Sequence, residues 1–214
     1  MNDSHIRGSF ISIEGIEGVG KSTNIRFICE FLNRLGIANI ATREPGGTPI
    51  SEQIRDLLLE VSNKSICPMA ELLMMFSGRA QHICEIIEPA LASGSWVICD
   101  RFTDATYAYQ GAGRGLSVDL IQQLEILVQG AIRPDLTLIF DIQTNLGLER
   151  ADQRGNPDRF EREDIEFFDR ARHCYLTIAD ASPDRCKLID ASQSIGQVQS
   201  EIRDLLEQFV ASRT

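Results

Sequence analysis

Residues 15–23 read GIEGVGKST, and this stretch limits the possible folds more strongly than any other part of the chain. It fits the pattern G-x-x-x-x-G-K-[ST], directly after the apolar run FISI and directly before a helical pattern. Glycines let successive backbone N–H groups turn inward, and the helix N-terminus adds partial positive charge. Lys21 is expected to reach the outer phosphates, and the Ser22 hydroxyl to bind magnesium. The motif predicts a strand, loop and helix that bind a nucleoside triphosphate.

Apolar runs rich in β-branched residues alternate with stretches of helical periodicity along the chain. Such alternation predicts right-handed crossovers and a parallel sheet. We therefore expect one α/β domain over residues 1–214, doubly wound around five parallel strands, with helices on both faces. The predicted strands are 10–13, 37–41, 96–99, 136–140 and 187–189. The first two predicted helices carry apolar faces at positions 25, 28, 29 and 32 and at positions 54, 57, 58 and 61, and further helices are predicted over 69–92, 117–130, 143–154, 164–180 and 196–210.

The chain carries a formal charge of −10, with 31 acidic and 21 basic side chains. Such a charge repels nucleic-acid polymers and anionic membranes, so neither is an expected partner. No apolar run approaches the roughly 18 residues that span a bilayer, and the N-terminal MNDSHIRG lacks the apolar core of a signal peptide. The six cysteines show no CxxC pair and no zinc spacing. We expect reduced, buried thiols in a cytoplasmic protein.

Polar residues follow the predicted strands, where open parallel sheets bind their ligands. Asp100 can hold magnesium through water and Arg101 can clamp a phosphate, although a helix-capping acid beside a solvated arginine is the alternative. Arg43 precedes a Pro-Gly-Gly turn, and turn chemistry alone would leave Arg43 and Arg55 solvated. Arg79 follows an apolar stripe of a kind found more often in a core than in a ligand pocket.

Two further segments allow both a functional and a structural interpretation. TYAYQGAGRG, at 106–115, suits recognition of a flat polar base at a helix end or loop, and a packed helix with a glycine-rich exit explains it nearly as well. In segment 148–172, charges of both signs surround GNP and indicate two helical pieces with a flexible joint. Arg150 and Arg154 share one helical face there, which a solvated, salt-bridged surface would also explain.

GIEGVGKST, TREPGGTP, CDRFTDATYAYQGAGRG, RPDLTLIFD and ERADQRGNPDRFE together resemble a bacterial thymidylate kinase, with order and spacing preserved over about residues 9–206. The resemblance implies a dTMP kinase, which transfers the γ-phosphate of ATP, with Mg2+, to thymidine 5′-monophosphate (dTMP) for dTTP synthesis. Transfer would be in line and without a covalent intermediate. The resemblance also suggests a homodimer. A nucleotide-dependent switch or accessory ATPase is the alternative, although the sequence has no NKxD stretch and no extra domain.

Roles for individual side chains follow from the same resemblance. Arg79, Thr106 and Gln110 would read the thymine edge, and Tyr109 would pack against the sugar and disfavour a 2′-hydroxyl. Glu17, an unexpected acid in an anion-binding loop, would face the 3′-hydroxyl of dTMP. ATP would contact Gly15, Ile16, Glu17, Gly18, Val19, Gly20, Lys21, Ser22, Thr23 and Arg150. The dTMP contacts would be Glu17, Arg43, Arg55, Phe76, Arg79, Arg101, Thr106, Tyr109 and Gln110. The metal ligands would be Ser22 and Asp100. The catalytic residues would be Lys21, Arg101 and Arg154.

Residues 148–162 correspond to the lid of the family. In one branch a basic residue in the phosphate loop neutralises the transferring charge, and in the other branch lid arginines do so. The loop interior IEGV has no base, so the resemblance makes Arg154 the expected catalytic arginine, with Arg150 near adenine or phosphate and Arg159 assisting. Asp190 and Ala191 would border adenine.

One position departs from the family pattern. The residue four positions before Arg79, often aromatic and stacked on thymine, is Met75 here. Either Phe76 stacks on the base from a shifted position or Met75 packs against it as a soft apolar contact. We expect Phe76 to supply the stacking.

Overall fold

A five-stranded parallel sheet forms the centre of the protein, and the computed structural model describes residues 7–62, 66–153, 155 and 157–213. The strand order is β2-β3-β1-β4-β5, with every neighbouring pair parallel. This arrangement confirms the predicted fold class. The strands are β1 (Phe10–Glu14), β2 (Asn39–Arg43), β3 (Trp96–Asp100), β4 (Leu136–Asp141) and β5 (Cys186–Asp190).

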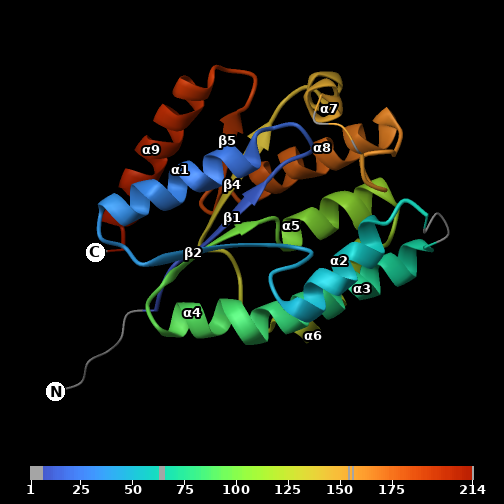
Figure 1. Cartoon of the computed structure of the whole chain (residues 1–214), viewed down its shortest axis with the longest axis horizontal. Coiled ribbons are helices and arrows are strands. Elements are labelled where there is room, and N and C mark those ends of the chain that lie inside the picture. Colours follow the sequence, from blue (N-terminus) through green and yellow to red (C-terminus); the bar gives the residue numbers. More distant parts are fainter. Residues whose placement is uncertain (1–6, 63–65, 154, 156, 214) are drawn as a thin grey trace.

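Helices cover both faces of the sheet (Figure 1). On one face α1 and α9 pack together against Ile11, and on the other η1 and α4 pack against Phe10. Successive side chains of a strand point to opposite faces, so neighbours in β1 enter different cores. The helices are α1 (Lys21–Arg34), α2 (Pro49–Leu59), α3 (Pro68–His82), α4 (Glu88–Ala92), α5 (Thr103–Thr106), α6 (Val118–Gln129), α7 (Thr144–Asp152), α8 (Ile165–Ala181) and α9 (Ile195–Ala211), with π-helical segments η1 (Ile83–Ile87) and η2 (Tyr107–Gly113).

Two predicted boundaries were wrong for local reasons. β2 begins at Asn39, because Ile37 donates its N–H to the Leu32 carbonyl at 3.0 Å and Gly36 takes a φ of 74°. That pair of features ends α1 in a left-handed cap, so Ile37 belongs to the helix end. The second predicted helix stops at Leu59, before position 61, and its Leu57 side chain is exposed where an apolar face was expected.

Residues 106–113 are helical, with a wide π-helical stretch in η2, and residues 114–115 form a turn. This matches the packed helix with a glycine-rich exit, the alternative to a helix end or loop. The Arg114 N–H reaches the Tyr109 carbonyl at 2.9 Å, five residues back. A Cβ on Gly113 would lie 2.5 Å from the Phe167 ring, so the glycine lets α8 approach η2 closely. The glycine-rich composition therefore reflects helix packing as well as the nearby cavity.

The cysteine expectation was only partly right. All six cysteines are free, and Cys99 and Cys186 are buried, but Cys67 and Cys84 are exposed. Cys67 precedes the first turn of α3, and Cys84 lies on the outer side of η1, so neither faces a core. Among the described residues, no helix combines the length and apolar character needed to cross a membrane.

The phosphate loop lies directly on α7. An added Cβ on Gly18 would come within 1.9 Å of the Gly147 carbonyl oxygen, and one on Gly147 would lie 2.8 Å from the Glu17 carbonyl oxygen. Two glycines thus allow backbone to touch backbone where the loop turns. This contact joins the loop that follows β1 to the helix that follows β4, and the position of the phosphate loop depends on it.

We predict that Gly147→Ala lowers the free energy of unfolding by about 1–3 kcal/mol, because the methyl group must displace the phosphate loop or Ile142. Gly196→Ala is the matched control, since that exposed helical glycine has open space at its Cβ position. The control should gain about 0.4–1 kcal/mol through reduced freedom of the unfolded chain. Urea unfolding measures both, and equal stability of the two variants would contradict the close contact.

Candidate functional site

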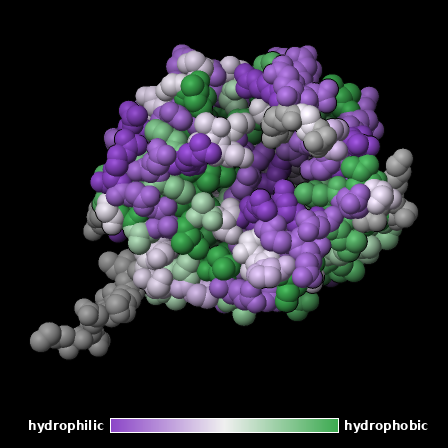
Figure 2. Space-filling view, viewed as in Figure 1, coloured by the Kyte–Doolittle hydropathy of each residue, from purple (hydrophilic) through white to green (hydrophobic). Residues whose placement is uncertain are grey.

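A cavity of about 460 Å³ opens beyond the carboxyl ends of β1, β2 and β3. The strand order reverses at β1, which is where ligands bind in open parallel sheets. Figure 2 shows hydrophilic residues around a hollow on this face. Although the chain has a net charge of −10, the cavity is lined by Lys21, Arg43, Arg55, Arg79, Arg101 and Arg150.

The phosphate loop forms one wall of this cavity. Gly18 and Gly20 adopt φ values of 73° and 86°, and Gly20 begins α1 without any capping side chain. The first N–H groups of α1 therefore remain available to an anion. The buried Lys21 ammonium donates to the carbonyl oxygens of Gly15 at 3.2 Å and Ile16 at 2.8 Å. Burial, followed by the charge of nearby Arg101, lowers the pKa of Lys21.

The predicted ATP contacts fall into two groups. The whole stretch 17–23 lines the cavity, as does Arg150, whose Nη1 donates to the Ala191 carbonyl at 2.8 Å. Gly15 and Ile16 are not among the lining residues, and the Ile16 side chain is buried in the core. Those two residues meet the site through their carbonyl groups, which hold Lys21.

The Glu17 carboxylate turns away from the loop amides and across the cavity. It accepts a hydrogen bond from Arg101 Nη2 at 2.6 Å and another from the Tyr109 hydroxyl at 3.1 Å, and lies 3.8 Å from Lys21 Nζ. An acid inside an anion-binding loop is therefore compatible with phosphate, because its charge is directed at Arg101. Glu17 separates the amide-rich wall from the opposite, arginine-rich wall.

Arg101 occupies a strained position at the end of β3. Its φ is 69°, the only positive φ of a described residue other than glycine. Such a conformation costs on the order of 1 kcal/mol or more and tends to persist at functional sites. The guanidinium lies over the Tyr109 ring, with 4.6 Å from its carbon to the ring centroid, and Nη1 donates to the Tyr175 hydroxyl at 3.3 Å. The backbone at Arg101 and the contacts of its guanidinium thus hold the side chain in one orientation.

Two carboxyl groups lie near Arg101. Asp100 lines the cavity, and its buried Oδ1 has no hydrogen-bond partner among the described residues. Glu14 is fully buried and accepts from the Phe102 N–H at 2.7 Å and the Tyr175 hydroxyl at 3.0 Å. Burial raises the pKa of Glu14 to about 7. Sequence reasoning missed Glu14 and Tyr175, and the only available signal was an acid at the end of an apolar strand.

Arg79 lies at the far end of the cavity and is 3% exposed. Its Nε donates to Glu44 Oε2 at 2.6 Å, and its Nη2 donates to the Thr106 hydroxyl at 2.9 Å and the Phe102 carbonyl at 3.2 Å. Nη1 is buried and has no partner among the described residues. One donor of a fixed guanidinium therefore remains for a ligand, which favours the pocket interpretation of Arg79 over the core interpretation.

Met75 and Phe76 lie in different surroundings. Met75 lines the cavity, whereas Phe76 is buried with Leu72 and Ile121 and is absent from the lining. The ring that was expected to stack on the base therefore does not face the cavity. The Phe76 ring lies behind Arg79, 4.9 Å from the guanidinium carbon to the ring centroid, so it supports the arginine from the core side.

Gln110 also lies outside the lining. Its Nε2 donates to the buried Glu71 at 2.9 Å, and its buried Oε1 has no partner among the described residues. Thr106 and Tyr109 do line the cavity, as predicted. Gln110 thus points toward a charged cluster centred on Glu71 instead of opening directly into the cavity.

The remaining predicted arginines divide between the cavity and this cluster. Arg43 and Arg55 both line the cavity. Arg43 pairs with Glu52 at 2.7 Å, and Arg55 Nη1 donates to the Pro45 carbonyl at 2.9 Å. Arg159, expected to assist phosphate transfer, is instead bound to Glu71 Oε2 at 2.7 Å and does not line the cavity. Arg154 lies outside the described residues. The missed lining residues near Arg159 are Asp158, Phe160 and Glu161.

Known proteins match nearly the whole chain. The thymidylate kinase family model matches residues 13–202. The thymidylate kinase of Teredinibacter turnerae is 55% identical over 203 residues, covering 95% of this chain and 99% of the relative. That of Ectopseudomonas mendocina is 53% identical over 199 residues, covering 93% and 95% of the two chains.

A solved structure agrees with these matches. The crystal structure of thymidylate kinase from Ehrlichia chaffeensis superposes with a TM-score of 0.77 at 35% identity, covering 94% of this chain and 99% of that one. The phosphate loop, the arginine-rich opposite wall and the family match agree on one chemistry, the phosphorylation of dTMP to its diphosphate with ATP. The chain belongs to the thymidylate kinase family.

Proposed function

We propose that Glu17 divides the cavity into an ATP side and a dTMP side, and that this division organises the transfer. The observation that carries the proposal is the orientation of Glu17, whose carboxylate is bound to Arg101 and Tyr109 across the cavity from the loop amides. ATP phosphates lie on the amides and Lys21. The 3′-hydroxyl of dTMP donates to Glu17. An oxygen of the acceptor phosphate attacks the γ-phosphorus as the bond to the ADP oxygen breaks, with no covalent enzyme intermediate.

The acceptor phosphate is clamped by arginines at the ends of β2 and β3. Arg101 supplies the principal contact, because its backbone strain and its stacking on Tyr109 fix its direction. Arg43 and Arg55 line the same wall and support it. Positioning and charge neutralisation supply most of the catalysis of phosphoryl transfer, which explains an active site rich in cations and without a nucleophile.

The thymine base lies at the Arg79 end of the cavity. Arg79 and Thr106 line this space, Nη1 of Arg79 has no partner among the described residues, and Met75 provides an apolar surface for the base. The Tyr109 ring packs against the sugar and disfavours a 2′-hydroxyl. Gln110 contributes through its Oε1, which has no partner among the described residues, while its Nε2 stays bound to Glu71.

Residues 148–162 act as a lid within a single kinase domain. The loop interior has no basic residue, so Arg154 supplies the charge that neutralises the transferring phosphate. Arg150 lines the ATP side of the cavity. Arg159 holds the segment to the core through Glu71 and Leu58, whose carbonyl accepts from Arg159 Nε at 2.7 Å.

These roles predict that one variant changes mainly a KM and the other mainly kcat. Glu17→Ala should raise KM for dTMP about tenfold and KM for ATP by less than about threefold, because the sugar contact and the orientation of Arg101 are lost. Arg154→Ala should lower kcat about 100-fold with a small change in either KM, because its contact forms in the transition state. Steady-state kinetics with both substrates varied measures these constants. Equal loss of affinity for both substrates in Glu17→Ala, or an unchanged kcat in Arg154→Ala, would remove the respective role.

Magnesium is held by few protein atoms. The Ser22 hydroxyl and Asp100 fit the ion, since Asp100 Oδ1 is buried, unpartnered among the described residues, and lines the same cavity. Among these residues no group of three or more His, Cys, Asp and Glu side chains could hold a metal alone. When bound, the ion would neutralise phosphate charge.

We predict that Asp100→Asn raises the Mg2+ concentration for half-maximal activity about tenfold, because a neutral amide replaces the carboxylate. Asp119→Asn, on the exposed part of α6, is the control and should titrate like the unmodified protein. The measurement is activity during Mg2+ titration after EDTA treatment. Identical titration curves for the two variants would exclude Asp100 from the metal site.

A homodimer through α3 and α6 is also proposed. The two helices share an apolar cluster and expose large apolar side chains: Met69 and Leu73 on α3, and Ile126 and Leu127 on α6, with Leu127 79% exposed. Leu127→Glu should convert a particle of twice 23.9 kDa to one of 23.9 kDa in light scattering, whereas Leu35→Glu, at the end of α1, should leave the mass unchanged. A monomeric unmodified protein would contradict the dimer. The cytoplasmic location stays a prediction that cell fractionation tests.

A further inference from the structure

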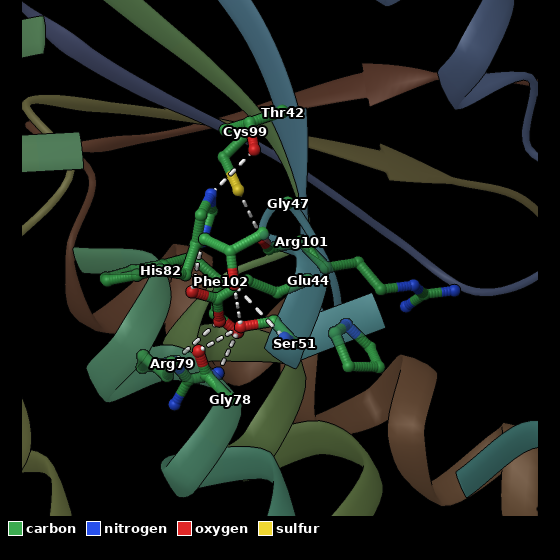
Figure 3. Close-up of polar contacts among 12 residues, drawn as sticks. Thr42, Glu44, Gly47, Ser51, Gly78, Arg79, His82, Cys99, Arg101 and Phe102 are labelled. Carbon is green, nitrogen blue, oxygen red and sulfur yellow. Dashed lines mark hydrogen bonds and ion pairs between the residues drawn. The ribbon is translucent and has the colours of Figure 1, made fainter. Parts of the chain in front are cut away.

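Several neighbouring groups hold the Arg79 side chain in place, among them Glu44 and Phe102 (Figure 3). Its guanidinium carbon lies 4.9 Å from the Phe76 ring centroid and 5.0 Å from that of Phe102. Its Nε and Nη2 are bound, so rotation of the side chain would break several contacts at once. Only Nη1 remains without a partner among the described residues.

The carboxylate that fixes Arg79 is itself fixed by a histidine. Glu44 is 6% exposed; its Oε2 accepts from Arg79 Nε at 2.6 Å and its Oε1 lies 3.0 Å from His82 Nδ1. An ionised carboxylate only accepts hydrogen bonds, so the hydrogen of this contact is on His82 Nδ1. Figure 3 shows Glu44 between the two side chains, which both come from α3. Glu44 thus has both oxygens engaged.

His82 is enclosed on its other side by the β2 end. It is fully buried, and its Nε2 lies 2.6 Å from the Thr42 hydroxyl oxygen. The Thr42 hydroxyl and Nε2 are thus within hydrogen-bond distance, on the side of the ring away from Glu44. A Cβ on Gly47, which has a φ of 90°, would lie 2.6 Å from ring atoms of His82, so the glycine turn forms a wall against the ring. His82 does not line the cavity.

We propose that His82 is a positioning residue that acts through Glu44 on Arg79 and thereby sets which pyrimidine the acceptor site takes. The inference rests on the proposed contact of Arg79 with the base. A guanidinium N–H at a fixed place pairs with a carbonyl oxygen, which thymine presents where cytosine presents an amino group. An amino group opposite the fixed N–H leaves two donors facing each other without an acceptor, and such mismatches are strongly rejected. Without the contact from His82, the Glu44 carboxylate can rotate. The Arg79 guanidinium can then move, and the site can accept cytosine.

The test compares dTMP with deoxycytidine monophosphate (dCMP) in His82→Leu, His82→Asn and the control His173→Leu, whose histidine is exposed on α8. In His82→Leu, KM for dTMP should rise about tenfold, the dTMP to dCMP ratio of kcat/KM should fall about tenfold, and KM for ATP should stay within about twofold. His82→Asn should recover most of the ratio, because its amide N–H can occupy the Nδ1 place beside Glu44. His173→Leu should leave all constants unchanged.

Several outcomes would overturn the proposal. A folded His82→Leu with an unchanged dTMP to dCMP ratio, or His82→Asn no better than His82→Leu, would reduce His82 to a core residue. Should thermal melting show that His82→Leu does not fold, Thr42→Val removes only the hydroxyl contact and should still lower the ratio about threefold. An unchanged ratio there would also reject the proposal.

Arg79→Gln separates this inference from the proposed base contact. If Arg79→Gln leaves KM for dTMP unchanged, Arg79 does not read the base, and both statements are wrong. If Arg79→Gln raises KM for dTMP while the His82 variants retain their ratio, the base contact holds and only the positioning role of His82 is wrong.

Discussion

The ion pair between a carboxylate and an arginine is the interaction on which the cavity depends. Glu17 holds Arg101 at 2.6 Å in a partly buried pair, and Glu44 holds Arg79 at the same distance in a buried pair. Removing one partner of the buried pair would leave a charge without compensation, which costs far more than an exposed pair contributes. The acids therefore keep their arginines in one orientation, and the cavity gains a fixed pattern of positive charge inside an acidic chain.

A charged cluster centred on Glu71, outside the cavity lining, joins segments that lie far apart in the sequence. Glu71 accepts from Arg114, Arg159 and the Gln110 amide. The same buried carboxylate thus meets η2, the turn after it and the segment beyond α7. Because hydrogen-bonded charges in one network are coupled, a change in one partner of Glu71 alters the energy of the others.

Features with a local signal could be predicted from the sequence. The phosphate loop, the apolar strands and most helices follow from patterns within about ten residues, and the structure has them. Ile37 was misplaced because the cap at Gly36 competes with strand propensity. The family resemblance also directed attention to Met75 and Phe76, but helix periodicity could not decide which ring or thioether faces the cavity.

Pairings between distant segments could not be predicted in the same way. Arg159 carries a charge typical of a phosphate contact, yet its partner, Glu71, lies 88 residues away in sequence. Glu44 was hidden in a turn motif whose proline and glycines explained the composition, and its partner Arg79 is 35 residues away. A sequence pattern indicates which side chains are charged, but tertiary packing decides which of them face one another.

The buried pairs explain how a chain of this size can place a strained residue at the centre of its site. The positive φ of Arg101 is unfavourable by itself. Glu17, Tyr109 and Tyr175 all contact its side chain, so relaxing the backbone would break several interactions together. Buried ion pairs contribute little net stability compared with apolar packing, and their advantage here is orientation. In the proposed role at the acceptor phosphate, a guanidinium that is already oriented would need little reorganisation during transfer, which is the condition under which fixed charges stabilise a transition state most effectively.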